Sequence, residues 1–219
     1  MRWADELPGV EVHGIQWPGR GGRIDEMPFT DMRQLVDSLV EAVEFRPPFA
    51  FFGHSFGALV AFETTRALRR TGKRRPHTLF VSAQRPPHLP HPHPLVPDAD
   101  DEVLLAELEL DLGPLAADAR EDPELARLLL SGYRADLTIL RDYGCPSGAP
   151  VDCPVVAVGG DQDTRTAAEL SQWRDHTTRT FQLSMLPGDH FYLRGQRSAL
   201  LRIITAALTG GPPSLAATT

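Results

Sequence analysis

Hydrophobic residues follow two different periods along this chain, and the change of period separates predicted helices from predicted strands. A spacing of three to four predicts helices at residues 30–45, 58–70, 100–111, 123–143, 166–175 and 194–208. Short alternating or continuous apolar runs predict strands at residues 10–17, 49–52, 78–83, 154–158 and 179–185. Because strands and helices alternate, we expect an α/β fold with a mainly parallel sheet and helices on both faces.

The alternation is interrupted once, where two helical patterns follow each other without a strand between them. Helices inserted at such a point are typical of a lid over an active site. We therefore expect four segments along the chain. They are a first part of the core at 1–83, a helical lid insertion at 84–150, a second part of the core at 151–209 and a flexible tail at 210–219.

Composition narrows the classes of function. The 219 residues are 42% hydrophobic and 23% charged, as in an ordinary globular protein. The net charge of −7 argues against nucleic acid as a partner, since binding phosphates needs a basic surface. There is neither an apolar run of about 18 residues, which a membrane span needs, nor the apolar core of a signal peptide near the start. We expect a cytoplasmic monomer that binds no membrane.

No cofactor or metal is predicted. Cysteine and histidine residues nowhere show zinc spacing. His88, His91 and His93 resemble a metal cluster, but prolines separate them and no carboxylate ligand accompanies them. A solvated loop is the better interpretation of this histidine-rich stretch.

The pattern Gly53-x-Ser55-x-Gly57 lies between a predicted buried strand and a predicted helix. In such a turn the serine is a nucleophile held in a strained conformation, and glycines on either side let the chain pass. The backbone N–H of Phe56 then lies at a helix N-terminus, where it can bind a developing oxyanion. His54 is expected to pack or form a hydrogen bond at the turn. The alternative is a glycine-rich turn with a passive serine.

A serine nucleophile needs a base, and the base needs a carboxylate to orient it. The chain order serine, acid, histidine predicts His190 as the base, in the loop between the last strand and the last helix. Asp161 and Asp163 both follow the preceding strand, and Asp163 is favoured because its longer reach brings it towards His190. Alternatively, both aspartates form turns and His190 is an ordinary loop histidine.

Five motifs in order resemble the type II thioesterases that accompany polyketide and nonribosomal peptide synthases, within the α/β-hydrolase superfamily. They cover the chain from about residue 3 to residue 208, at Ile15–Arg23, Gly53–Ala58, Tyr133–Asp136 with Tyr143, Gly160–Asp163 and Gly188–Phe191.

The resemblance implies an editing enzyme that removes acyl groups from the phosphopantetheine arms of acyl or peptidyl carrier proteins. Ser55, His190 and Asp163 would form the triad, and the Phe56 N–H would bind the oxyanion. A small-molecule serine esterase is one alternative, because the same triad cleaves oxygen esters. A truncated, inactive carrier-binding homologue is another.

One departure from the family pattern concerns the N-terminus. Members of the family begin with a strand, a P-x-A-G-G-like loop and a helix that ends near W-A-x-x-L-P. This sequence starts inside that helix, at residues 2–8. We therefore expect the N-terminal strand and the oxyanion loop, which gives a second N–H donor, to be missing.

Overall fold

The computed structural model describes residues 3–91, 96–112, 122–145 and 148–210. Contacts divide the chain into two compact units, each described here by itself. The first is formed by residues 1–13, 39–89 and 146–219, and the second by residues 14–38 and 90–145.

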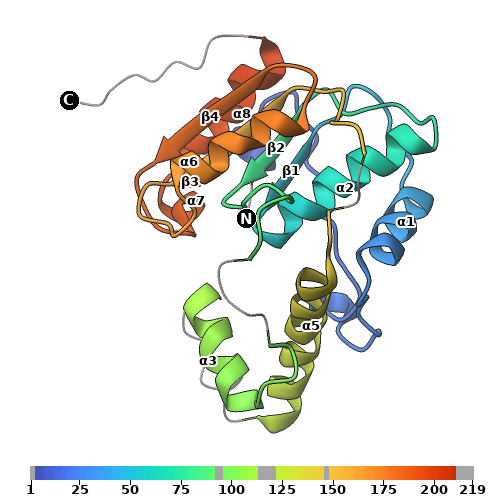
Figure 1. Ribbon diagram of the computed structural model, residues 1–219, viewed down its shortest axis with the longest axis vertical. Helices are drawn as coiled ribbons and strands as arrows, with labels where there is room; N and C mark the ends of the chain where they lie inside the picture. Colours follow the sequence, from blue (N-terminus) through green and yellow to red (C-terminus); the bar gives the residue numbers. More distant parts are fainter. Residues whose placement is uncertain (1–2, 92–95, 113–121, 146–147, 211–219) are drawn as a thin grey trace. The chain divides into compact units, whose positions relative to one another are not determined.

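The first unit is built on a parallel sheet of four strands in the order β1-β2-β3-β4 (Figure 1). The strands are β1 (Phe51–His54), β2 (Leu79–Ser82), β3 (Val155–Gly160) and β4 (Phe181–Leu186). They confirm four of the predicted strands and the parallel arrangement. All six residues of β3 and all four of β2 are buried, as expected for parallel strands that are covered on both faces.

The strand predicted at residues 10–17 is wrong. The chain there forms no strand, and Val10, Val12 and Ile15 are 36%, 40% and 47% exposed. A strand needs a hydrogen-bonded neighbouring strand, and none of the described strands pairs with this segment. Its alternating pattern is therefore not sufficient to make it a strand.

The predicted helices are confirmed with shifted ends. The first unit contains η1 (Ala4–Glu6), α2 (Phe56–Arg70), α6 (Ala167–Ser171), η3 (Gln172–His176), α7 (Tyr192–Gly195) and α8 (Arg197–Thr209). The helix expected at 166–175 is divided into α6 and a 3₁₀ turn, and the last helix is divided at Gln196. Thr166 and Glu169 form a reciprocal capping box at the start of α6. The tail after residue 210 lies outside the described residues.

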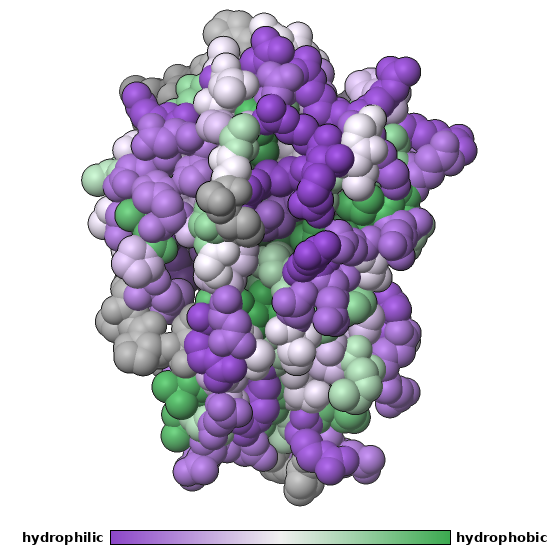
Figure 2. Space-filling view, turned by 45° about the vertical axis from the view of Figure 1, so that its right-hand side comes forward, coloured by the Kyte–Doolittle hydropathy of each residue, from purple (hydrophilic) through white to green (hydrophobic). Residues whose placement is uncertain are grey.

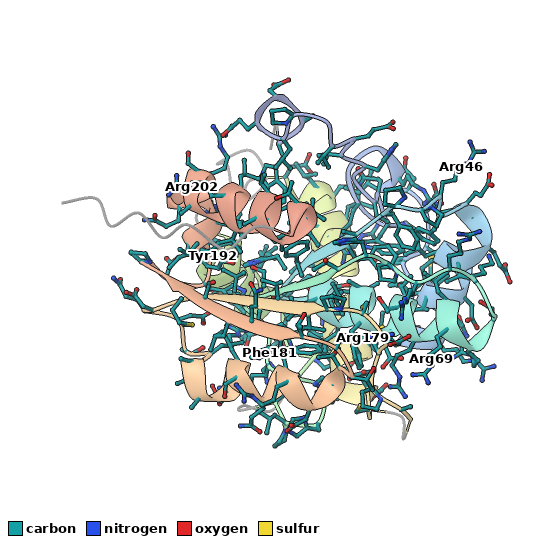
Figure 3. All side chains as sticks on the ribbon, turned by 90° about the horizontal axis from the view of Figure 1, so that it is seen from above. Arg46, Arg69, Arg179, Phe181, Tyr192 and Arg202 are labelled. Carbon is teal, nitrogen blue, oxygen red and sulfur yellow. The ribbon has the colours of Figure 1, made fainter. Side chains whose placement is uncertain are left out.

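Successive side chains of a strand point to opposite faces of the sheet, and helices cover both faces (Figure 3). Phe80, Val156 and Val158 belong to one buried cluster with Leu200 and Ile204 of α8. On the other face Gly159 approaches the Leu170 side chain of α6. The prediction of helices on both faces is therefore confirmed.

The second unit is helical and has a small apolar core. It contains η2 (Gly21–Arg23), α3 (Asp101–Leu112), α5 (Pro123–Asp142) and most of α1 (Met32–Ala42). Leu104 of α3 packs with Leu130 and Leu137 of α5. Arg20 pairs with Asp136 at 2.5 Å and donates to the Gly132 carbonyl oxygen at 2.8 Å. The predicted boundaries of the lid insertion stay a prediction.

The surface drawn in Figure 2 is mainly hydrophilic, and hydrophobic residues appear on it in separate patches. Within the described ranges, no helix combines the length and the apolar character that crossing a membrane requires.

Leu79→Ala tests the core beneath the sheet. Leu79 is fully buried in β2, so removing its side chain is expected to lower the free energy of unfolding by about 2 to 5 kcal/mol. Met27→Ala is the control, because Met27 is 88% exposed and its loss should change the same quantity by less than about 0.5 kcal/mol. Chemical denaturation measures both, and equal effects would contradict the assigned core.

Candidate active site

Ser55 occupies the turn between β1 and α2 in a conformation that a non-glycine residue rarely adopts. Its φ is 53° and its ψ is −128°, which is a strained combination for a residue with a side chain. The Ser55 N–H donates to the Ser82 carbonyl oxygen at 2.8 Å. The Ser55 side chain makes no capping hydrogen bond to α2. The turn is thus held through its backbone, and the hydroxyl is not used to cap the helix.

The two glycines that flank the Ser55 turn differ in whether a side chain would fit in their place. A Cβ atom on Gly53 would lie 2.2 Å from the Gly57 carbonyl oxygen and 2.5 Å from the Ala58 Cα. Only glycine permits this approach of β1 to the first turn of α2. Gly57 differs, because a Cβ atom there would meet nothing within 4 Å.

His190 and Asp163 are brought together from two different loops. The Nδ1 atom of His190 lies 2.9 Å from Oδ2 of Asp163. Their side chains are 15% and 2% exposed, respectively. The opposite side of the histidine ring therefore keeps its Nε2 atom for another partner, as a general base requires.

Hydrogen bonds of the Asp161 side chain and of the backbone join the loop after β3 to the loop after β4. Asp161 accepts a hydrogen bond from the Gly188 N–H at 2.9 Å, and the Gln162 N–H donates to the Gly188 carbonyl oxygen at 2.9 Å. Gly160 is needed here, since a Cβ atom on it would lie 2.2 Å from the Asp189 carbonyl oxygen. Asp161 therefore holds the histidine loop in place, while Asp163 contacts the histidine itself.

Electrostatics keep Asp163 ionised. Burial by itself raises the pKa of this carboxyl, but the hydrogen bond from His190, the nearby charge of Arg165 and the Arg165 backbone N–H outweigh it and lower the pKa to about 2. Oδ1 of Asp163 accepts from the Arg165 N–H at 3.2 Å and from its Nη1 at 3.3 Å. Both carboxylate oxygens thus have partners.

His54 lies next to this pair. Its ring centroid is 4.8 Å from that of His190, so the predicted base is adjacent to the residue that precedes Ser55. Phe56 is the first residue of α2, and the N–H groups of a first helical turn have no partner within the helix. The predicted site residues therefore gather where β1, β3 and β4 end.

Sequence reasoning missed three residues of this region. Arg165 pairs with Asp163, and the hydroxyls of Ser82 and Tyr192 form a chain with His54. Ser82 ends a buried strand beside the strand that precedes the nucleophile, so a polar residue at that position was a usable signal. Nothing in the sequence indicated which side chain Tyr192 would meet.

Only part of the histidine-rich stretch lies within the described residues. His88 Nδ1 lies 2.7 Å from His176 Nε2, and its other ring nitrogen lies 3.1 Å from the Gln172 amide oxygen. His93 falls outside the described residues. Among those that are described, no three His, Cys, Asp or Glu side chains are grouped to hold a metal ion.

Gly53→Ala is expected to disrupt the turn. The added methyl would overlap backbone atoms, so the free energy of unfolding should fall by more than about 2 kcal/mol. Gly57→Ala should leave stability unchanged or raise it, because alanine favours helix and meets no neighbour. Chemical denaturation compares the two variants. A Gly53→Ala protein as stable as the wild type would contradict the geometry of the turn.

Stability should depend on pH through Asp163. Its pKa falls from 3.8 to about 2 on folding, so the unfolded chain takes up a proton first as the solution is acidified. The stabilisation is complete above pH 3.8 and is lost as the pH falls towards 2. The unfolding free energy of the wild type, minus that of Asp163→Asn, should therefore decrease between pH 5 and pH 3. An unchanged difference would show that the native pKa is not lowered.

Known proteins resemble the chain over almost its whole length. The family model described as "Thioesterase domain" matches residues 1–208. The thioesterase PikA5 of Streptomyces venezuelae is 40% identical over 203 residues, which cover 90% of this chain and 71% of that protein.

Solved structures of thioesterases also resemble this chain. RedJ, a thioesterase from the prodiginine biosynthetic pathway of Streptomyces coelicolor, superposes with a TM-score of 0.85 at 35% identity, covering 94% of this chain and 83% of its own. The type II thioesterase BorB from the borrelidin biosynthetic cluster gives 0.81 at 36% identity, with coverages of 94% and 84%. These structures have the α/β-hydrolase fold predicted here. The chain belongs to the thioesterase domain family.

Proposed function

We propose that this protein is an editing thioesterase that hydrolyses acyl groups from the phosphopantetheine arms of acyl or peptidyl carrier proteins. The observation that carries the proposal is the 2.9 Å contact between Asp163 and His190 beside the strained turn of Ser55. The similarity to PikA5 and BorB supports a role in a polyketide or nonribosomal peptide pathway.

In the first half of the reaction, the Oγ atom of Ser55 attacks the thioester carbonyl carbon while His190 Nε2 takes the hydroxyl proton. The carbonyl oxygen becomes an oxyanion that the Phe56 N–H stabilises. As the intermediate collapses, the C–S bond breaks and His190 returns the proton to the leaving pantetheine sulfur. The acyl group is then an ester of Ser55.

In the second half, a water molecule attacks the ester carbonyl and gives its proton to His190. The bond between the acyl carbon and Ser55 Oγ breaks, and the proton passes to the serine. A free carboxylic acid leaves. Asp163 accepts the Nδ1 hydrogen of His190 throughout, which keeps Nε2 available for protons and stabilises the imidazolium between the two transfers.

The helical insertion at 84–150 is proposed as a lid that shapes an acyl channel and excludes bulk water. The packing of α3 against α5 supports an insertion with its own core. The cytoplasmic location and the monomeric state stay predictions.

The proposal is tested with a carrier protein that bears an acetyl-phosphopantetheine arm. We expect the wild type to remove the acetyl group, and Ser55→Ala to leave it in place, as followed by intact mass. The Ser55 side chain does not cap α2, so the variant should fold like the wild type. A folded wild type that removes no acetyl group would contradict the proposal.

The alternatives give different outcomes in the same experiment. A small-molecule esterase would hydrolyse p-nitrophenyl acetate faster than the carrier-bound thioester. A non-catalytic homologue would bind the carrier protein without deacylating it, and Ser55→Ala would bind equally well.

A further inference from the structure

Ser82 holds two consecutive residues of the nucleophile turn. Its carbonyl oxygen accepts the Ser55 N–H at 2.8 Å, and its Oγ atom lies 2.9 Å from Nδ1 of His54. Ser82 is fully buried at the end of β2. Because its backbone is fixed in the sheet, both contacts tie the turn to a rigid element.

The same hydroxyl reaches the histidine loop. Ser82 Oγ lies 2.6 Å from the phenolic oxygen of Tyr192, which is two residues after His190. Tyr192 is 2% exposed and belongs to the cluster between α8 and the sheet (Figure 3). His54, Ser82 and Tyr192 thus form one hydrogen-bonded chain, here called the tyrosine chain, from the nucleophile turn to the histidine loop. Ser82 and Tyr192 are buried, and His54 is partly buried.

The ring of His54 lies against the base. Its centroid is 4.8 Å from that of His190, and the two ring planes are inclined by 42°. Burial lowers the pKa of His54 to about 3, and the neighbouring His190 contributes in the same direction. His54 is therefore neutral near pH 7 and does not compete with His190 for the serine proton. Its uncharged ring packs against the ring of His190.

The donor and acceptor roles of the groups in the tyrosine chain depend on one another, because the hydroxyl in its middle has a single hydrogen. The Ser82 hydroxyl has one hydrogen, so it donates to one of its two neighbours and must accept from the other. The orientation of each group consequently fixes that of the next. Removing any one hydroxyl leaves buried polar groups that have lost a partner, which is costly in a dry interior.

We propose that His54, Ser82 and Tyr192 are positioning residues that set the placement of His190 relative to Ser55. The inference rests on the proposed role of Ser55 as nucleophile and His190 as its base. The three residues take no part in bond making. They act by keeping the nucleophile turn and the histidine loop at one separation, and small displacements of reacting groups slow catalysis strongly.

The test measures the reactivity of Ser55 towards a fluorophosphonate, independently of any carrier protein. Ser55 Oγ forms a bond to phosphorus, fluoride leaves, and His190 takes the hydroxyl proton. Tyr192→Phe cuts the tyrosine chain and retains the ring. We expect the maximal rate constant of inactivation to fall about tenfold or more, with little change in the probe concentration that gives half of that rate.

Two matched controls separate positioning from general destabilisation. Thr65→Val removes a buried hydroxyl of α2 that donates to the Ala61 carbonyl oxygen at 2.9 Å. Thr64→Val removes a fully buried hydroxyl of α2 that donates to the Val60 carbonyl oxygen at 2.7 Å. Both controls should react at the wild-type rate. Thermal unfolding of each variant establishes that it is folded at the assay temperature.

A double-mutant cycle tests whether the residues act as one unit. Ser82→Ala should slow inactivation as Tyr192→Phe does, and the double variant should be no slower than the slower single variant. If Ser82→Ala does not fold, the inactivation rates of Tyr192→Phe and of its two controls suffice to test the inference.

The outcomes separate this inference from the proposed function. Wild-type inactivation rates in Tyr192→Phe would overturn the inference and leave the nucleophile intact, as would fully additive effects in the cycle. An equal slowing in Thr64→Val would also overturn it, because it would indicate a purely structural effect. A folded wild type that never reacts with the probe would overturn the assignment of Ser55, and the inference with it.

Discussion

The in-register hydrogen bonding of four parallel strands is the constraint on which the site depends. His54 is paired with Ser82, Ser82 with Val158, and Gly160 with Leu186. Parallel strands share one direction, so their carboxyl ends meet at one edge of the sheet, where α/β folds place their ligands. A shift of one residue in any pair would turn the side chains at the strand ends to the opposite face.

Close backbone approaches convert this edge into a site. Gly53 and Gly160 both lie where a single methyl group would overlap a carbonyl oxygen, the first at the nucleophile turn and the second at the histidine loop. The strained conformation of Ser55 persists because the sheet, α2 and Ser82 determine it from several sides. The strain at Ser55 is therefore maintained by the rigid structure around it.

Asp163 and His54, two neighbours of His190, differ in charge near pH 7. The pKa of Asp163 is lowered by hydrogen bonds and by Arg165 despite burial, whereas that of His54 is lowered mainly by burial. The acid is thus charged and His54 neutral near pH 7, with His190 between them. Because its pKa is so low, His54 is a poor proton acceptor, which leaves the role of base that we propose for His190.

The sequence by itself determined the α/β class and the order of the core elements, and it predicted the roles of Ser55 and His190, because these depend on local period, turn chemistry and chain order. It was wrong about residues 10–17, since a strand exists only where a neighbour pairs with it. Only the tertiary structure decided that Asp163 rather than Asp161 contacts His190. It also joined Ser82 to Tyr192 across 110 positions of the chain. Such contacts depend on how loops approach one another at the edge of the sheet, and no local pattern of residues encodes that approach.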